Sequence, residues 1–326
     1  QGNLNNDIGM PLTLLRWQNE EYAVIEMGAS QAGDIAYLTQ IAQPDIALLN
    51  NAGQAHLEGF GSVQGVAQAK AEIIQGLDAD GLFIYNADDA FAALWKTLGS
   101  AHKRLTFGVQ QTADINSPPE DYRITWQADG FQASFPVQTP QQSFEVRLAL
   151  AGEHNRLNAL AAIAAATALG ISVPNIQRGL ATLRPVDGRL QPLFLSNGAC
   201  VINDTYNANV DSVNAALQVL QAAVSKRRTL VLGDLAELGA ASVASHAGLG
   251  KQAYALGIDR VLSCGEFSRH TSDHFAGEAK HFSSQAALIE FLRKDSHAQD
   301  VLLIKGSRAA AMERVVRALQ IEGQTC

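Results

Sequence analysis

The sequence has few cysteines, no long apolar run and no surplus of basic residues, and each absence excludes a class of protein. Cys200, Cys264 and Cys326 are odd in number, far apart and without metal-site spacing. A disulfide framework is therefore not expected, and a reducing cytoplasm fits. No apolar run approaches the roughly 18 residues of a membrane span, and no signal-like segment is found. We expect a cytoplasmic protein with no membrane partner.

The charge balance argues against nucleic acid as a partner. The net charge is -8 over 326 residues, and charged residues make up 17% of the chain. A nucleic-acid surface needs a basic stripe to neutralise phosphates, and none is seen. A few placed cations could still hold small anionic ligands. At 47% hydrophobic residues the chain can form sizeable cores, and its length predicts about two domains.

The first half of the chain alternates short apolar runs with helix-like stretches. The runs end in polar or small residues and lie at 22–26, 46–50 and 82–86. Helices are expected between them, at 31–42 and 62–76. This alternation predicts parallel strands buried on both faces. In such sheets, ligands bind beyond the carboxyl ends of the strands, where these polar endings fall.

The pattern changes at residues 120–150, where apolar and polar residues alternate. Alternation with period two predicts an antiparallel meander with one solvated face. Two alanine-rich helices are then expected, at about 154–169 and 173–183. The fold class is therefore α/β, with a mostly parallel sheet and an antiparallel meander in the first domain.

A second α/β series follows and predicts a Rossmann-like domain. Its strands are expected at 200–204, 229–233, 260–264, 279–282 and 301–305. Its helices are expected near 210–224, 241–256, 284–295 and 308–320. Asp187-Gly188 is a candidate hinge, so we divide the chain into domains 1–188 and 189–326.

Three residues of the first domain suggest a hard-cation site: Glu26, His56 and Lys70. Mg²⁺ prefers oxygen ligands, and a carboxylate at a strand end suits it. An ammonium cannot be a ligand, but a buried lysine with a lowered pKa can react with CO₂ to give an anionic carbamate. The alternative is a strand-end histidine and a lysine on a helix surface.

The run Gly152-Glu-His-Asn-Arg-Leu-Asn158 opens an apolar helix after a glycine turn. Asn155 can cap that helix. Asn155 and Asn158 share a helix face, and their carboxamides carry donors and acceptors that suit a purine edge. Helix capping alone remains the alternative.

Further polar residues lie just after the predicted domain boundary and at the ends of strands in the second domain. Arg189 could clamp a phosphate, or it could be a solvated linker residue. Asp204 ends a strand, where an acidic residue often binds ribose hydroxyls, although the surrounding run also has turn composition. Lys305 and Arg308 lie beside a helix start and suit a carboxylate. Turn chemistry explains the neighbouring glycines equally well.

Taken together, these motifs resemble the Mur ligase family over nearly the whole chain. They occur in the family's order: Gly2-Asn-Leu-Asn-Asn-Asp-Ile-Gly-Met-Pro11, Glu26-Met-Gly-Ala, His56-Leu-Glu-Gly-Phe-Gly61, Ala69-Lys-Ala-Glu-Ile73, Asn86-Ala-Asp-Asp89, Gly152 to Asn158, Asp204-Thr-Tyr-Asn-Ala-Asn209, Gly233-Asp-Leu-Ala-Glu-Leu-Gly239 and Lys305-Gly-Ser-Arg308. The Tyr-Asn-Ala-Asn and Gly-Asp-x-x-Glu-Leu-Gly pair favours the branch that adds D-Ala-D-Ala.

The resemblance implies an ATP-dependent ligase of peptidoglycan precursor synthesis, with ATP and Mg²⁺ as cofactors. ATP would phosphorylate the terminal carboxylate of UDP-N-acetylmuramoyl-tripeptide, and the amine of D-Ala-D-Ala would attack the acyl phosphate. Fixed cations would stabilise the charge that develops on phosphoryl oxygens. We expect these two substrates as partners and a monomer in solution, although an exposed sheet edge would allow self-pairing.

The resemblance also implies roles for individual residues. The metal site would consist of Glu26, His56 and a carbamylated Lys70, and the catalytic groups would be Lys70, His56 and Arg189. The nucleotide-binding residues would be Asn155 and Asn158 at adenine, Arg189 at the γ-phosphate, Asp204 at ribose, and Asn207 and Asn209 lining the ATP side. Substrate would contact Asn5, Asn6, Asp234, Glu237, Lys305, Ser307 and Arg308, with Lys305 to Arg308 seating the dipeptide.

One departure limits what these residues are expected to do alone. The family's phosphate loop, of the type Gly-x-x-Gly-Lys-Thr-Thr, and its UDP-gripping N-terminal domain precede the Gly2 to Pro11 segment, so we expect this chain to start after them. Without the loop, ATP should bind poorly and the chain alone should be inactive. The alternatives are a non-catalytic nucleotide- or peptide-binding module and a sister ligase of the folylpolyglutamate synthase kind.

Overall fold

The structure, a computed structural model, describes residues 4–53, 57–127, 130–225 and 227–321. The chain forms two compact units. The first contains the residues up to Tyr122 together with 135–146 and 157–178. The second contains 123–134, 147–156 and the residues from Gly179 onward. The domain division at 188/189 stays a prediction.

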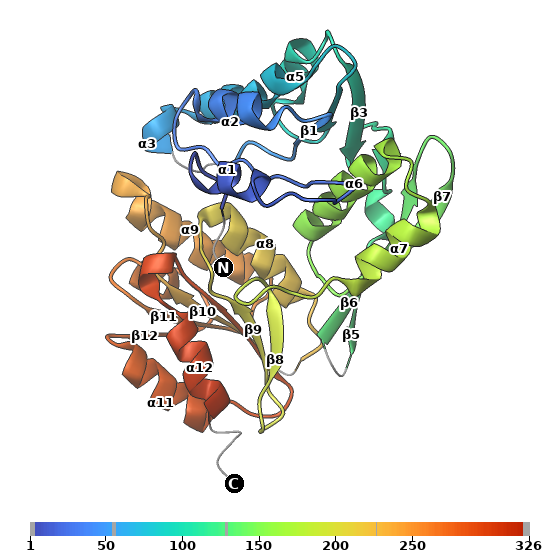
Figure 1. Cartoon of the computed structure of the whole chain (residues 1–326). Helices are drawn as coiled ribbons and strands as arrows, with labels where there is room; N and C mark the ends of the chain where they lie inside the picture. Colours follow the sequence, from blue (N-terminus) through green and yellow to red (C-terminus); the bar gives the residue numbers. More distant parts are fainter. Residues whose placement is uncertain (1–3, 54–56, 128–129, 226, 322–326) are drawn as a thin grey trace. The chain divides into compact units, whose positions relative to one another are not determined.

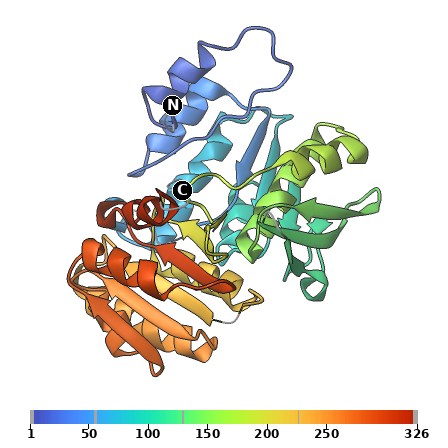
Figure 2. The same ribbon diagram turned by 90° about the horizontal axis from the view of Figure 1, so that it is seen from below.

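The first sheet has the strand order β1-β2-β3-β4-β6-β5, and β7 pairs with β6. Its strands are β1 (Ile46–Leu49), β2 (Leu82–Asn86), β3 (Lys103–Gly108), β4 (Ile115–Asn116), β5 (Arg123–Gln127), β6 (Gly130–Gln138) and β7 (Ser143–Leu148). β1 to β4 are parallel, and β5 and β6 are antiparallel (Figure 2 shows the later strands in green). This confirms the predicted parallel sheet and the antiparallel pairing within the meander.

Seven α-helices belong to the sequence up to Thr182 among the described residues. They are α1 (Gly9–Leu14), α2 (Asp34–Ala42), α3 (Leu57–Phe60), α4 (Val63–Ala71), α5 (Ala92–Leu98), α6 (Glu153–Ala168) and α7 (Val173–Thr182). A 3₁₀ turn over Glu72–Gly76 continues α4. The helices predicted at 31–42, 62–76, 154–169 and 173–183 are thus confirmed within a few residues.

The strand predicted at 22–26 is wrong. These residues form no strand, and Val24 is 98% exposed. A strand exists through pairing with a neighbour, because its backbone groups have no partners within the strand itself. Within the described residues β1 pairs only with β2, so 22–26 remains an extended segment despite its apolar composition.

The second sheet has the order β12-β11-β10-β13-β9-β8. Its strands are β8 (Gln191–Phe194), β9 (Cys200–Asp204), β10 (Arg227–Gly233), β11 (Arg260–Cys264), β12 (Glu278–Phe282) and β13 (Asp300–Lys305). All neighbours are parallel except β8 and β9. The helices are α8 (Val210–Gln221), α9 (Ser242–Ala255), α10 (Arg269–Asp273), α11 (Gln285–Asp295) and α12 (Glu313–Ile321).

Two apolar layers hold this second sheet between helices. Ile202, Leu230 and Leu303 pack with residues of α8 and α9 on one face. Val201, Val231 and Leu302 pack with residues of α11 and α12 on the other face. Figure 1 shows α11 and α12, in orange and red, on one side of the strands and α8 and α9 on the other. Strands buried on both faces of a sheet are apolar along their whole length. Their positions could therefore be predicted from the apolar runs in the sequence.

The described residues contain no helix that is both long and apolar enough to cross a membrane.

Candidate active site

Lys70 lies at the end of α4, and its amine is partly buried. Ser62 caps the start of the helix, and its Oγ accepts the N–H of Gly65 at 3.0 Å. Lys70 Nζ donates to the main-chain oxygen of Asn51 at 2.8 Å. Burial lowers the pKa of Lys70, and the carboxylate of Asp89 opposes that shift. The amine is therefore neutral more often than that of an exposed lysine, and the neutral form is the one that reacts with CO₂.

Glu26 is held by a contact from the start of the described chain. Asn5 Nδ2 donates to Glu26 Oε1 at 3.0 Å, and Gly28 N donates to Asn5 O at 2.8 Å. A Cβ at Gly28 would lie 2.6 Å from Asn5 Nδ2, so a larger residue there would displace the Asn5 side chain. Asn6 Oδ1 instead accepts the N–H of Gly9 at 2.7 Å, at the start of α1. Asn5 thus fixes a carboxylate, and Asn6 has a local structural contact.

His56, the third member of the predicted metal site, lies outside the described residues. Among the residues that are described, no group of three or more His, Cys, Asp or Glu side chains is placed to hold a metal ion. Glu26 offers one carboxylate, and a carbamate on Lys70 would offer two further oxygens. This donor set has the oxygen character that Mg²⁺ prefers, and Mg²⁺ commonly takes only one or two protein ligands beside substrate phosphates.

The two asparagines of α6 have different surroundings. α6 begins at Glu153, so Asn155 lies in its first turn, and the prediction that Asn155 caps the helix is wrong. Gly152, with φ of +102°, turns the chain into the helix just before Glu153. Asn155 Nδ2 donates to Ala151 O at 2.8 Å. Asn158 Oδ1 accepts from Asn50 Nδ2 at 2.7 Å, which links α6 to the end of β1.

Asp204 and Lys305 form an internal ion pair at the carboxyl edge of the second sheet. The register of β9 and β13 places them opposite each other. Their charged atoms are 2.7 Å apart, and the side chains are 12% and 3% exposed. Asp204 Oδ1 also accepts the N–H of Leu190 at 3.1 Å, and Lys305 Nζ donates to Asn207 O at 2.8 Å. Both predicted ligand-binding groups therefore have protein partners.

Asn209 also serves the local structure. Its Oδ1 accepts the N–H of Ser212 at 2.8 Å, and its own N–H donates to Ser212 Oγ at 3.0 Å. This reciprocal pair is a capping box that starts α8.

Asp234 ties together the loops that follow three neighbouring strands. Its carboxylate accepts the N–H groups of Glu266, Phe267 and Ser268 at 2.9, 3.0 and 2.7 Å. Its main-chain oxygen accepts the N–H of Ser307 at 2.9 Å. Glu237, three residues later, is exposed and has a left-handed φ of 61°. Asp234 is therefore a bracing residue in this structure, whereas Glu237 is presented to solvent.

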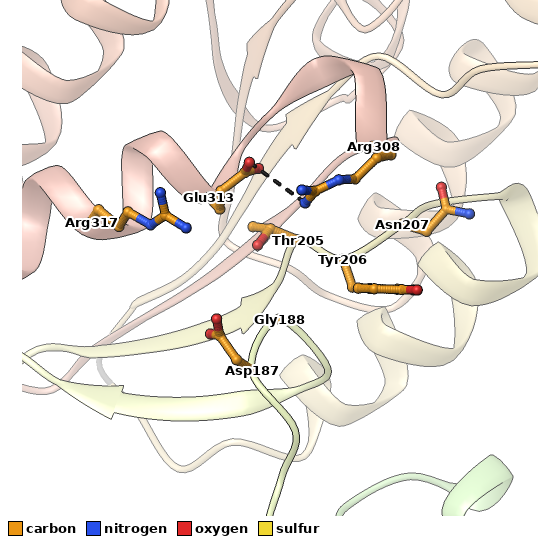
Figure 3. A pocket seen from close by; sticks show the side chains of 8 residues that line it. All are labelled: Asp187, Gly188, Thr205, Tyr206, Asn207, Arg308, Glu313 and Arg317. Carbon is orange, nitrogen blue, oxygen red and sulfur yellow. Dashed lines mark ion pairs between the residues drawn. The ribbon is translucent and has the colours of Figure 1, made fainter. Parts of the chain in front are cut away.

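A cavity of about 550 Å³ opens at the same carboxyl edge, within the second unit. Its wall carries charges of both signs and consists of Asp187, Gly188, Thr205, Tyr206, Asn207, Arg308, Glu313 and Arg317 (Figure 3). Arg308 Nη1 lies 3.6 Å from Glu313 Oε1. The guanidinium of Arg189 lies 4.5 Å from the ring centroid of Tyr206, in cation–π contact.

Comparison with known protein families identifies the family of this chain. Residues 1–166 match the Mur ligase middle domain, and residues 188–308 match the Mur ligase glutamate ligase domain. The chain belongs to the Mur ligase family. The match covers the middle and C-terminal parts of the family, as the sequence predicted.

This Mur ligase is similar to proteins of one branch of the family. It is 46% identical to UDP-N-acetylmuramoyl-tripeptide--D-alanyl-D-alanine ligase of Escherichia coli, over 100% of the chain and 71% of that protein. MurF from Acinetobacter baumannii superposes with a TM-score of 0.88 at 35% identity, covering 98% of the chain and 70% of that structure. MurF from Thermotoga maritima in complex with ADP gives 0.84 at 29% identity, covering 99% and 72%.

Of the eight residues that line this Mur ligase's cavity, sequence reasoning singled out Asn207 and Arg308 as site residues and missed the other six, among them Asp187, Glu313 and Arg317. Asp187 was considered only as part of a hinge. Glu313 and Arg317 lie at i and i+4 on α12, so they share a face of the helix that follows Lys305-Gly-Ser-Arg308. That spacing was the available signal, but it is common on solvated helices and becomes informative only once the cavity is known.

Proposed function

We propose that this chain carries out the reaction of the D-alanyl-D-alanine-adding ligases of peptidoglycan synthesis. Members of its family are ATP-dependent ligases. The observation that carries the proposal is the 46% identity to the Escherichia coli enzyme along the whole chain. The cavity with both charge signs supports it, because the acceptor of this reaction is a zwitterion.

The proposed reaction has two steps. The terminal carboxylate of UDP-N-acetylmuramoyl-tripeptide attacks the γ-phosphorus of ATP, which gives an acyl phosphate and ADP. The neutral amine of D-Ala-D-Ala then attacks the acyl carbon, and the tetrahedral intermediate collapses to an amide as phosphate leaves with the bonding electron pair. The amine loses its proton to solvent or a nearby base. Fixed cations lower the barrier by stabilising the negative charge on phosphoryl oxygens.

Lys70 and Glu26 are the proposed Mg²⁺ site, with His56 as a further candidate. The lowered pKa of Lys70 supports the carbamate, because the neutral amine is the nucleophile toward CO₂. Bound Mg²⁺ would neutralise phosphate charge during phosphoryl transfer. Asn5 would orient the Glu26 carboxylate through its 3.0 Å hydrogen bond.

The residues proposed to contact the nucleotide are asparagines, one arginine and one aspartate. Asn155 and Asn158 remain candidates for adenine, because each has a carboxamide group with capacity beyond its one described hydrogen bond. Arg189 remains the candidate for the γ-phosphate, since its guanidinium is exposed and oriented by the Tyr206 ring. Asp204 has unused lone pairs for a ribose hydroxyl despite its ion pair. Asn207 and Asn209 would flank the ATP side.

The dipeptide is proposed to bind at the cavity in the second unit. Arg308 and Arg317 could bind its carboxylate, and Asp187 could accept hydrogen bonds from its ammonium before deprotonation. Lys305 would act indirectly, since it holds Asp204 and the main-chain oxygen of Asn207. Ser307, Asp234 and Glu237 belong to the adjoining loops and stay substrate-binding proposals.

The acceptor amine provides the test. The natural protein that contains this sequence is incubated with ATP, Mg²⁺ and UDP-N-acetylmuramoyl-tripeptide, and phosphate release is followed as acceptors are added. D-Ala-D-Ala should trigger phosphate release, whereas D-alanine or L-glutamate alone should not. Release driven by glutamate would favour a sister ligase of the folylpolyglutamate kind. Nucleotide binding without any turnover would favour a non-catalytic module.

Three further proposals accompany the activity. We propose a cytoplasmic location, consistent with free Cys200 and Cys264, and a monomer, which sedimentation would test. We also propose that residues 1–326 alone bind ATP weakly, because the sequence contains no Gly-x-x-Gly-Lys-Thr-Thr loop. Tight binding in a calorimetric titration of these residues would contradict that proposal.

A further inference from the structure

His246 is a buried histidine that bonds through both ring nitrogens. It lies on α9 with 0% exposure. Its Nδ1 lies 2.8 Å from the main-chain oxygen of Ser242, an acceptor, so Nδ1 carries the proton. Its Nε2 accepts the N–H of Leu235 at 3.2 Å. The two contacts together define a single neutral tautomer, with one nitrogen donating and the other accepting.

Leu235, which His246 holds, is the third residue of the loop 233–239, which carries the Gly-Asp-Leu-Ala-Glu-Leu-Gly motif. Leu235 is next to Asp234, whose carboxylate accepts three N–H groups from residues 266–268. Phe267 is one of these three donors, and its ring stacks on the His246 imidazole with centroids 6.2 Å apart. The imidazole therefore contacts both the loop and the segment that braces it.

This brace extends to the cavity. The main-chain oxygen of Asp234 accepts the N–H of Ser307, and the next residue, Arg308, lines the cavity. The backbone at Gly233 also packs closely, since a Cβ there would lie 2.7 Å from Met312 Cγ. A shift of Leu235 would therefore be passed to the segment that positions the Arg308 guanidinium.

We propose that His246 is a positioning residue for the acceptor substrate, holding the 233–239 loop and, through Asp234 and Ser307, the arginine at the cavity. The inference rests on the proposed function, in which the dipeptide occupies this cavity. His246 touches no reacting atom. It acts because its Nε2 is the acceptor that fixes the Leu235 amide.

Protonation of the ring should release the loop. An imidazolium donates from both nitrogens, so Nε2 could no longer accept from Leu235. Burial lowers the pKa of His246, while the Ser242 carbonyl and Asp234 on the loop raise it and His270 on α10 lowers it. Because the folded-state pKa lies below the ordinary value, the contact persists at neutral pH and is lost as pH falls through the lowered pKa.

Two substitutions of His246 test the roles of its ring nitrogens Nδ1 and Nε2 separately. His246→Asn reaches about as far as Nδ1, so it keeps the donor to Ser242 and loses the acceptor for Leu235. His246→Gln reaches about as far as Nε2, so it keeps that acceptor. In the natural protein containing this sequence, the Asn variant should raise KM for D-Ala-D-Ala about ten-fold, the expected effect of one lost buried hydrogen bond. KM for ATP should change less than about two-fold.

The Gln variant should recover most of the wild-type KM, and it should lack the rise in dipeptide KM that acid produces in the wild type. His297→Asn, an exposed histidine, is the matched control and should behave as wild type. Unchanged dipeptide KM in the Asn variant, or a lowered unfolding temperature without a KM change, would overturn the proposal. A KM for D-Ala-D-Ala that is raised equally in the Asn and the Gln variants would also overturn the proposal.

Hydrogen exchange at the Leu235 amide tests the His246 contact independently of the proposed enzymatic function. A wild-type protein without dipeptide-dependent turnover would refute the function. The positioning contact would still be tested, because the Leu235 amide should exchange faster in the Asn variant and stay protected in the Gln variant. Equal exchange in both variants would overturn the contact's role.

Discussion

Two lysines, one in each unit, show how differently the same side chain is used. Lys70 donates to a neutral carbonyl oxygen, and burial lowers its pKa. Lys305 is buried more deeply, yet its ammonium has the carboxylate of Asp204 at 2.7 Å and a carbonyl oxygen at 2.8 Å. The two lysines therefore differ in whether a carboxylate contacts the amine directly, because Lys305 has an ion pair with Asp204, whereas the described contact of the Lys70 amine is to a carbonyl oxygen.

The difference assigns different tasks to the two sites. Burial lowers the pKa of Lys70, which favours the neutral amine that carbamate chemistry needs. Lys305 is an ammonium whose partners are parts of its own sheet edge, so it supports the geometry of the cavity wall at Asn207. Substitutions test this difference. For Lys305 the measured quantity is the free energy of unfolding, and for Lys70 it is catalytic activity and carbamate formation.

The largest expected effect is on stability, at Lys305. Lys305→Met keeps the length of the side chain but leaves the Asp204 carboxylate buried without its cation. Removing one member of a buried ion pair typically costs about 3–5 kcal/mol, so the free energy of unfolding should fall by that order. Urea denaturation measures it.

The double variant Lys305→Met with Asp204→Asn is the control for that experiment. It removes the orphaned charge and should recover part of the lost stability. If the single Met variant is as stable as the wild type, Lys305 does not hold the sheet edge, and the assignment of a supporting role is wrong.

The next effect is on catalysis, at Lys70. Lys70→Ala removes the proposed carbamate, and with it a group that would hold charge near the transferred phosphoryl group. Removing one such electrostatic contact usually costs about 10²–10³ in kcat, so Mg²⁺-dependent ligation should fall by about that factor while the unfolding temperature changes little.

A direct signal accompanies the loss of activity. With ¹³C-bicarbonate, the wild type should give a carbamate carbon resonance that Lys70→Ala lacks. Lys96→Ala, at an exposed lysine of α5, is the matched control and should keep both the resonance and the activity. Full activity in the Lys70→Ala variant would refute the carbamate.

The lysine comparison also shows where sequence reasoning succeeds and where it stops. Continuous apolar runs such as 301–305 predicted strands correctly, because a strand buried on both faces must be apolar throughout. β3 was missed because it starts with the exposed charged residues Lys103 and Arg104. β8 was missed because it contains Pro192, which is tolerated on an edge strand. The run 22–26 has the composition of a strand but forms no strand and pairs with no strand among the described residues.

The candidate site residues were proposed from motifs, but their contacts were not predictable. Asp204 and Lys305 are about a hundred residues apart, and they meet because β13 lies beside β9 in the sheet. No local pattern encodes that strand order. Asp234 was predicted to bind substrate, whereas its carboxylate is occupied by three main-chain N–H groups of a loop that contributes no recognisable motif.

The smallest expected effect concerns the carboxylate of Asp89, whose charge opposes the lowering of the Lys70 pKa by burial. Asp89→Asn removes the charge that raises the pKa of Lys70 and keeps one carbonyl oxygen, which can accept only one of the two N–H groups, of Ala52 and Phe91, that the carboxylate binds through separate oxygens. The pKa should fall further, so labelling of Lys70 by an acid anhydride should reach half-maximal rate at lower pH, with Asp78→Asn as the exposed control. An unchanged midpoint would mean that charge at Asp89 does not reach Lys70. A midpoint shifted upward would mean that the substitution opened the site to water, and that burial rather than a missing anion dominates the chemistry of this lysine.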